Sequence, residues 1–202
     1  VVLSDNTKLI VNAGTSVIYP ARFNKYSNNR NVYVNGNCHF AVAKDPLHPF
    51  VVNMGSLKVK VLGTHFSVNS YNDNDRIVVT LEEGLVKAFD ARHSMYLRPN
   101  EQLIYYRSDG RMQKQRVDAM ACNSWVNGNI DFSAQTLGQI LKTIERHYDV
   151  KFDVSRDIDL NRRYTVNFRN GEPLDRVLKV LSMIYGNMFY AKKGNTVKLY
   201  IE

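Results

Sequence analysis

The chain has 202 residues, of which 44% are hydrophobic and 23% charged, and its formal net charge is +8. These proportions are typical of a folded globular protein, and the length allows one large or two small domains. No apolar run approaches the roughly 20 residues of a membrane helix, and no signal peptide is visible in the given sequence, which starts at Val1. Basic residues are scattered, the densest groups being Arg162-Arg163 and Lys192-Lys193, so a solvated surface is favoured over nucleic-acid binding.

Residues 1–117 are predicted to form an all-β domain of many short strands, arranged as a β-roll or in a sandwich-like way. Alternating or short apolar runs between turn residues predict strands around residues 9–11, 17–19, 32–34, 40–42, 57–61, 66–68, 77–81, 95–97 and 103–106. The apolar positions Leu57, Val59 and Val61 are odd-numbered, whereas Phe66 and Val68 are even-numbered, so the chain should bulge or turn a corner at Gly63. Gly84 breaks the next alternation before Val86.

Residues 118–128 are interpreted as a connector, and residues 129–202 as a small α+β domain of two β-α-β units. The second domain contains an internal repeat at an offset of 37 residues. Leu137, Ile140, Leu141, Ile144 and Tyr148 follow the spacing of one helical face, and Leu174, Val177, Leu178, Leu181 and Tyr185 repeat it. An alternating strand precedes each helix, and another strand follows it.

Local signals predict where these helices begin and end. Ser133 is a candidate N-cap for the first helix, Pro173 suits the first turn of the second, and Gly186 suits its end. The closing segment is predicted to be a hairpin that turns at residues 193–195. Two β-α-β units side by side would place both helices on one face of a single small sheet.

Three segments of the first domain resemble motifs of the FecR family, the periplasmic parts of bacterial transmembrane anti-sigma factors. Residues 36–52 read GNCHFAVAKDPLHPFVV, residues 61–68 read VLGTHFSV, and residues 79–86 read VTLEEGLV. The positions that match the family pattern, including a W-x-x-G in the connector, are Gly36, Phe40, Asp45, Pro49, Phe50, Gly63, Thr64, Phe66, Glu83, Gly84 and Trp125. Cys38 and Asn100 depart from the pattern mildly, standing at an alanine-like and a glycine position. Trp125 is expected either where the domains meet or in the core of the second domain.

The second domain looks like the short N-terminal domain of secretins and TonB-dependent receptors. FecR proteins of the Bacteroides type end in a domain of this kind. The two resemblances together imply a non-catalytic periplasmic sensor and relay region of an inner-membrane anti-sigma factor. Its implied partner is the N-terminal signalling domain of a TonB-dependent outer-membrane transporter. The implied output is control of an extracytoplasmic-function sigma factor through a cytoplasmic part that this chain lacks. The implied location is the periplasm, with a tether to the inner membrane through a transmembrane segment outside this chain.

Patterns that would indicate catalysis, a metal or a cofactor are missing. Neighbouring Glu82 and Glu83 should point to opposite faces of a strand, and Asp157 and Asp159 are interpreted as solvated charges. No G-x-S-x-G, G-x-G-x-x-G or P-loop occurs, and residues 72–75 do not match an EF-hand loop. The five histidines show no zinc-ligand spacing, and we predict no cofactor and no metal. Cys38 and Cys122 are more consistent with free thiols, although an oxidising compartment would permit a bridge.

The candidate partner-binding element is the strand formed by Tyr164 to Phe168, with Tyr164, Val166 and Phe168 on one face. A small open sheet has edge strands whose unpaired backbone groups can accept a strand from another protein. The competing interpretation is that this strand is central and fully paired. A second hypothesis for the whole chain is a carbohydrate- or envelope-binding β domain without a transcriptional role, because exposed tyrosines can stack on sugars.

Overall fold

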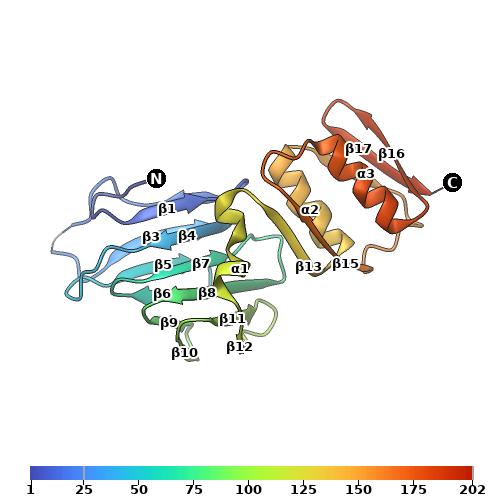
Figure 1. The fold of residues 1–202 in the computed structure, drawn as a ribbon. Helices are drawn as coiled ribbons and strands as arrows, with labels where there is room; N and C mark the ends of the chain where they lie inside the picture. Colours follow the sequence, from blue (N-terminus) through green and yellow to red (C-terminus); the bar gives the residue numbers. More distant parts are fainter. Residues whose placement is uncertain (25, 202) are drawn as a thin grey trace. The chain divides into compact units, whose positions relative to one another are not determined.

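The computed structural model describes residues 1–24 and 26–201, so Glu202, at the end of the predicted second domain, lies outside the described residues. The chain divides into two compact units, Val1–Val126 (unit 1) and Asn127–Glu202 (unit 2). Each unit has its own cluster of buried hydrophobic residues. Unit 1 consists almost entirely of strands, whereas unit 2 contains both long helices (Figure 1).

Unit 1 is a sandwich of two six-stranded sheets, which confirms the all-β prediction. Sheet A has the order β1-β4-β7-β8-β11-β12, with β1 Lys8–Val11, β4 Asn37–Ala41, β7 His65–Asn69, β8 Arg76–Glu83, β11 Glu101–Tyr106 and β12 Met112–Arg116. Sheet B has the order β10-β9-β6-β5-β3-β2, with β10 Ser94–Leu97, β9 Val86–Phe89, β6 Leu57–Val61, β5 Phe50–Met54, β3 Arg30–Asn35 and β2 Ser16–Ile18. Neighbouring strands are antiparallel except for β3 and β5, which are parallel.

The chain crosses repeatedly between the two sheets, and glycines stand at several of the crossings. Gly63 lies between β6 of sheet B and β7 of sheet A, so the parity change in the sequence corresponds to a corner. Gly84, with φ +94°, lies at the return crossing between β8 and β9. A Cβ atom added to Gly84 would lie only 3.1 Å from the carbonyl oxygen of Gly63, so the two corners touch.

Three strands of unit 1, β5, β9 and β12, have no counterpart among the predicted strands. The first half of β5 is continuously apolar, so it shows no alternation, because Phe50, Val51 and Val52 are all buried. β12 reads MQKQR and is almost entirely exposed, so its side chains carry no hydrophobic signal. It is held instead by antiparallel backbone pairing with β11. Strands of this kind are defined by their neighbours in space rather than by their own sequence.

Unit 2 contains the two predicted β-α-β units, and its strands form two sheets. The strands and helices are β13 Ile130–Thr136, α2 Leu137–Tyr148, β14 Lys151–Val154, β15 Arg163–Phe168, α3 Leu174–Tyr185, β16 Met188–Lys193 and β17 Thr196–Ile201. β13 pairs with β15 in a two-stranded antiparallel sheet, and β14-β17-β16 form a separate three-stranded sheet. The prediction of one small sheet is therefore wrong, because the closing strand β17 pairs between β14 and β16.

Both helices have the predicted apolar face, but the predicted N-cap of the first is wrong. All ten residues of the repeat lie in or against the core of unit 2. The N-cap of α2 is Thr136, which forms a reciprocal capping box with Gln139, whereas Ser133 lies inside β13. Pro173 is the N-cap residue of α3, and Gly186 ends this helix with φ +108°.

The connector contains two short helical turns, α1 Ala119–Cys122 and the 3-10 turn η1 Ser124–Asn127. Asp118 caps α1 by accepting a hydrogen bond from the Ala121 backbone N–H at 3.0 Å. Ala119 is 1% exposed and Asn123 5% exposed, so one side of this connector is buried. Trp125 lies in η1, is half-buried, and is not part of the core of unit 2.

Candidate partner-binding site

Strand β15 alternates between core-facing and exposed residues, as its sequence predicts. Phe168 is buried, and Tyr164 and Val166 are half-buried and pack against the core of unit 2. The intervening residues Arg163 and Thr165 are exposed. This arrangement holds one face of the strand firmly on the core and leaves the other face to solvent.

In the described part of the chain, β15 is an edge strand. It pairs through its whole length with β13, from Ile130 opposite Phe168 to Thr136 opposite Arg163. No other described strand pairs with it, because the sheet has only two strands. The competing interpretation, a central and fully paired strand, is therefore wrong for this part of the chain. The second edge of β15 carries backbone groups that the ladder with β13 does not use.

A bulge in β13 lies beside β15 and depends on side chains of β15. The register shifts between Phe132 and Gln135, and Ala134 has φ +49°. The Ala134 N–H donates to Thr165 Oγ1 at 3.0 Å, and Arg163 Nη1 donates to the Ala134 carbonyl at 2.8 Å. These contacts satisfy the backbone groups that the bulge removes from the ladder. They also explain why β13 continues past the residue that looked like a helix cap.

An aromatic and cationic cluster stands at the start of β15. The Arg162 guanidinium lies over the rings of Tyr164 and Tyr185, at 5.7 and 4.5 Å from their centroids. Arg162 Nη1 also donates to the Tyr185 carbonyl at 3.2 Å. Burial raises the pKa of the Tyr164 hydroxyl above its usual value, and this oxygen has no hydrogen-bond partner among the described residues. The cluster fixes the chain as it enters the candidate strand.

The other sheet edges of unit 2 carry features that discourage strand addition. β16, at one edge of the three-stranded sheet, ends in Lys192 and Lys193, and charged lysines are a common guard of exposed edges. β14, at the opposite edge, has only four residues, and β13 is bulged. β15 has six residues, no proline, no lysine and no register shift of its own. Among these four strands, β15 is therefore the most suitable for receiving a strand.

The three FecR-like segments of unit 1 meet at the glycine corners. The Val42 N–H donates to the Thr64 carbonyl at 3.0 Å, and the Thr64 hydroxyl donates to the Leu85 carbonyl at 3.3 Å. A Cβ atom on Gly63 would lie 2.8 Å from the Cα atom of Lys44. The motif residues at these positions therefore hold the crossings between the sheets and are not arranged as a ligand site.

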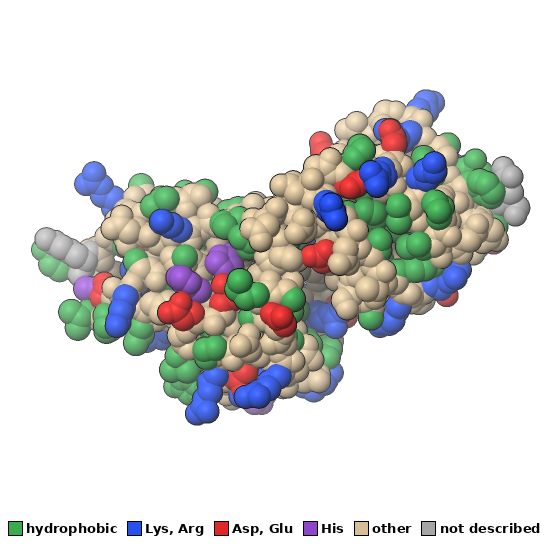
Figure 2. All heavy atoms as spheres, viewed as in Figure 1, with side chains coloured by type: hydrophobic (Ala, Val, Ile, Leu, Met, Phe, Trp, Pro, Cys, Tyr) green, Lys and Arg blue, Asp and Glu red, His purple; other side chains and the backbone are tan. Residues whose placement is uncertain are grey.

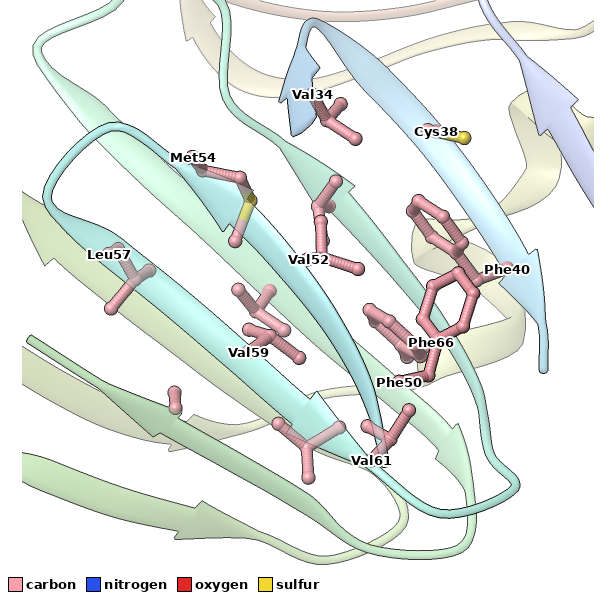
Figure 3. Close-up of a cluster of buried hydrophobic side chains, with 14 of the residues drawn as sticks. Val34, Cys38, Phe40, Phe50, Val52, Met54, Leu57, Val59, Val61 and Phe66 are labelled. Atoms are coloured by element: carbon pink, nitrogen blue, oxygen red, sulfur yellow. The ribbon is translucent and has the colours of Figure 1, made fainter. Parts of the chain in front are cut away.

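The aromatic motif residues form the centre of the sandwich (Figure 3). Phe40 of β4 stacks on Phe66 of β7, with ring centroids 5.1 Å apart, and meets Phe50 of β5 edge-on at 6.0 Å. All three are 0% exposed. They join both sheets, so their contribution is to packing.

Asp45 and Pro49 shape the loop before β5. Asp45 Oδ1 accepts the N–H groups of Leu47 and His48 at 3.0 and 3.1 Å, and its Oδ2 lies 2.9 Å from His48 Nδ1. The hydrogen bond with the His48 side chain, followed by those from the backbone, holds the pKa of Asp45 below its usual value. The Pro49 carbonyl accepts the N–H of Arg30 at 2.8 Å.

Unit 1 contains a buried ion pair that was not predicted from the sequence. Arg30 is 4% exposed and its Nη1 lies 2.6 Å from Asp5 Oδ2. Its Nε also donates to the His48 carbonyl at 2.7 Å, which joins the N-terminal segment to the loop before β5. A signal was present, because Arg30 has the same parity as the core residues Val32 and Val34. A charged residue that alternates in step with core residues points to the buried face of the strand, and it needs a buried partner there.

A second missed cluster ties the connector to sheet A. Glu82 Oε2 lies 3.1 Å from His39 Nε2, and its Oε1 accepts a hydrogen bond from the Asn123 side chain. Glu83 is mostly exposed and lies 3.6 Å from His65. Figure 2 shows histidine and carboxylate side chains gathered on this face of unit 1. Each carboxylate thus has a structural partner.

The described residues contain no group of three His, Cys, Asp or Glu side chains that could hold a metal ion. Within the same residues, no helix combines the length and apolar character needed to cross a membrane. Both cysteines are free thiols, Cys38 buried and Cys122 exposed. Burial raises the pKa of Cys38 to about 12, because a thiolate is costly in an apolar core.

Comparison with known proteins gives family matches to both units. A family model described as FecR protein matches residues 1–87, and one described as FecR, C-terminal matches residues 129–199. Two crystal structures of a proposed anti-sigma factor from Parabacteroides distasonis ATCC 8503 resemble the whole chain, with a TM-score of 0.89 each. Their sequence identities are 29% and 28%, and each alignment covers 100% of this chain and 93% of the other. No protein with a curated description matches the chain.

Proposed function

Since the chain belongs to the FecR family, we propose that it is the periplasmic sensor and relay region of an inner-membrane anti-sigma factor. In this proposal it receives a signal from the N-terminal signalling domain of a TonB-dependent outer-membrane transporter. It passes the signal through a membrane segment to a cytoplasmic part that controls an extracytoplasmic-function sigma factor. The region itself performs no catalysis, and it acts by binding other proteins.

The observation that carries the proposal is the unguarded edge of β15. A strand from the transporter domain could pair with this edge through main-chain hydrogen bonds, which is a common mode of peptide recognition. The core-facing side chains of Tyr164, Val166 and Phe168 would keep the strand flat on unit 2 while its edge accepts the partner. The family and the two similar structures support a regulatory role, which fits such a contact.

Two proline variants test the contact against its effect on folding. The N–H groups of neighbouring strand residues point to opposite edges, so Val166→Pro and Asn167→Pro remove donors from different edges. One variant breaks a hydrogen bond of the ladder with β13. The other removes a donor only from the free edge, and its unit 2 should remain folded and unfold cooperatively. Calorimetric titration with the purified transporter signalling domain should show binding lost in the variant that stays folded.

Wild-type affinity in the folded proline variant would overturn the proposal for β15. If both proline variants unfold unit 2, Asn167→Lys provides the test, because Asn167 is exposed and an edge lysine opposes strand pairing. This variant should fold normally and bind the signalling domain more weakly, and unchanged binding would reject the site. Thr196→Lys, at an exposed position of the central strand β17, is the matched control and should bind like the wild type.

A further inference from the structure

The outer face of sheet B has an unusual distribution of charge. In its six strands the core-facing residues include Val34, Val52 and Val59, so the residues between them point outwards. The outward-facing residues include three lysines and three aromatic residues: Lys58, Lys60, Lys87, Tyr33, Phe89 and Tyr96. We call these six residues the lysine-aromatic face. None of the six strands contains an aspartate or a glutamate.

The lysines repel one another across the sheet. Lys60 of β6 stands directly opposite Lys87 of β9, and like charges at such positions destabilise a sheet. No described carboxylate forms an ion pair with Lys58, Lys60 or Lys87. The acid that follows β9, Asp90, accepts the backbone N–H groups of Arg92 and His93 instead. The positive charge of these lysines is therefore left for solvent ions or a bound anion to neutralise.

Aromatic rings lie among these charges. The Lys87 ammonium stands 6.0 Å from the ring centroid of Phe89 and 5.8 Å from that of Tyr96. Tyr33 is 55% exposed on the same face, and it is paired across the sheet with Ile18 on one side and Asn53 on the other. At this margin the surface has a hollow of about 440 Å³, lined in part by Ile18, Tyr33 and Arg22.

We propose that the lysine-aromatic face binds an anionic glycan, a polysaccharide that carries carboxylate or phosphate groups. The lysines provide point charges for the acidic groups, and the rings provide flat apolar surfaces for the sugar rings. An acidic protein partner fits less well, because protein interfaces are enriched in arginine and depleted in lysine, whereas the outward-facing cations of the six strands are lysines. The preference for a glycan over a nucleic acid rests on the periplasmic location in the proposed function.

The test is calorimetric titration of the full chain with polygalacturonate, a carboxylated glycan. Methyl-esterified polygalacturonate is the uncharged control. Poly-L-glutamate and oligo(dT) are control polyanions that carry negative charge but lack the polygalacturonate chain. Removal of three positive charges, in Lys58→Gln/Lys60→Gln/Lys87→Gln, should weaken polygalacturonate binding about tenfold. The matched variant Lys151→Gln/Lys179→Gln/Lys198→Gln loses the same charge from exposed positions of unit 2 and should bind like the wild type. Phe89→Ala/Tyr96→Ala should also weaken binding.

Three results would overturn the proposal. These are no binding of polygalacturonate by the wild type, an equal loss of affinity in the two lysine variants, and tighter binding of poly-L-glutamate or oligo(dT). The last would assign the face to an acidic protein or a nucleic acid. The transporter domain is absent from this titration, so a negative result with polygalacturonate does not affect the proposed β15 contact. A negative result in the β15 test likewise leaves the glycan titration valid.

Discussion

Replacement of Gly84 by alanine should destabilise unit 1 by about 2–5 kcal/mol. The residue has φ +94°, and an L-residue in such a conformation costs about 1–2 kcal/mol. The new Cβ atom would also lie 2.9 Å from Thr64 Oγ1 and 3.1 Å from the Gly63 carbonyl oxygen. The Gly63 carbonyl oxygen belongs to the backbone and cannot move aside as a side chain can. Overpacking therefore adds about 1–3 kcal/mol.

Gly55→Ala separates the two costs within the same unit. Gly55 has φ +68°, but its added Cβ atom would meet only Arg107 Nη1 at 3.8 Å, which is an ordinary contact. This variant should therefore lose only the conformational part, about 1–2 kcal/mol. Hydrogen exchange at the amides of β7 and β8 in the full chain measures both losses. Equal destabilisation by the two substitutions would refute the argument that the touching corners need glycine for space.

Two further changes test local features of the fold. Thr136→Ala removes the N-cap of α2 and should cost about 0.5–2 kcal/mol in urea unfolding, whereas Ser133→Ala, at an exposed strand position, should cost under about 0.5 kcal/mol. A larger loss of stability in Ser133→Ala than in Thr136→Ala would identify Ser133 as the cap. The lowered pKa of Asp45 means that its stabilising effect is present above the unfolded-state pKa, near 4, and is lost as pH falls through the folded-state value. Stability should therefore fall less steeply below about pH 5 in Asp45→Asn than in the wild type, and parallel curves would contradict the role of the His48 contact.

The apolar faces of α2 and α3 could be predicted residue by residue, because the signals that carry them are local. A repeated apolar face spans Leu137 to Tyr148 and Leu174 to Tyr185, which are the bounds of α2 and α3. Such a face must be buried wherever the helix packs. The cap of α2 was misplaced because the bulge at Ala134 prolongs β13, and this bulge depends on side chains from a strand about 30 residues away.

The candidate site could be predicted only in part. The alternation of Tyr164, Val166 and Phe168 identifies a strand with one buried face, but alternation does not determine what lies beside a strand. The edge position of β15 follows from the separation of the strands of unit 2 into two sheets, which is a property of the whole unit. The lysine-aromatic face was missed for the same reason, since Lys60 and Lys87 are far apart in sequence and meet only through pairing of β6 with β9.

The central claim is that the chain works by presenting the β15 edge to a transporter signalling domain. The most direct measurement is amide hydrogen exchange of the full chain with and without the purified signalling domain. We expect slower exchange at residues 163–168 on complex formation, with little change in the edge strands β12 and β16. Protection that appears elsewhere while residues 163–168 exchange at their unbound rate would contradict the account.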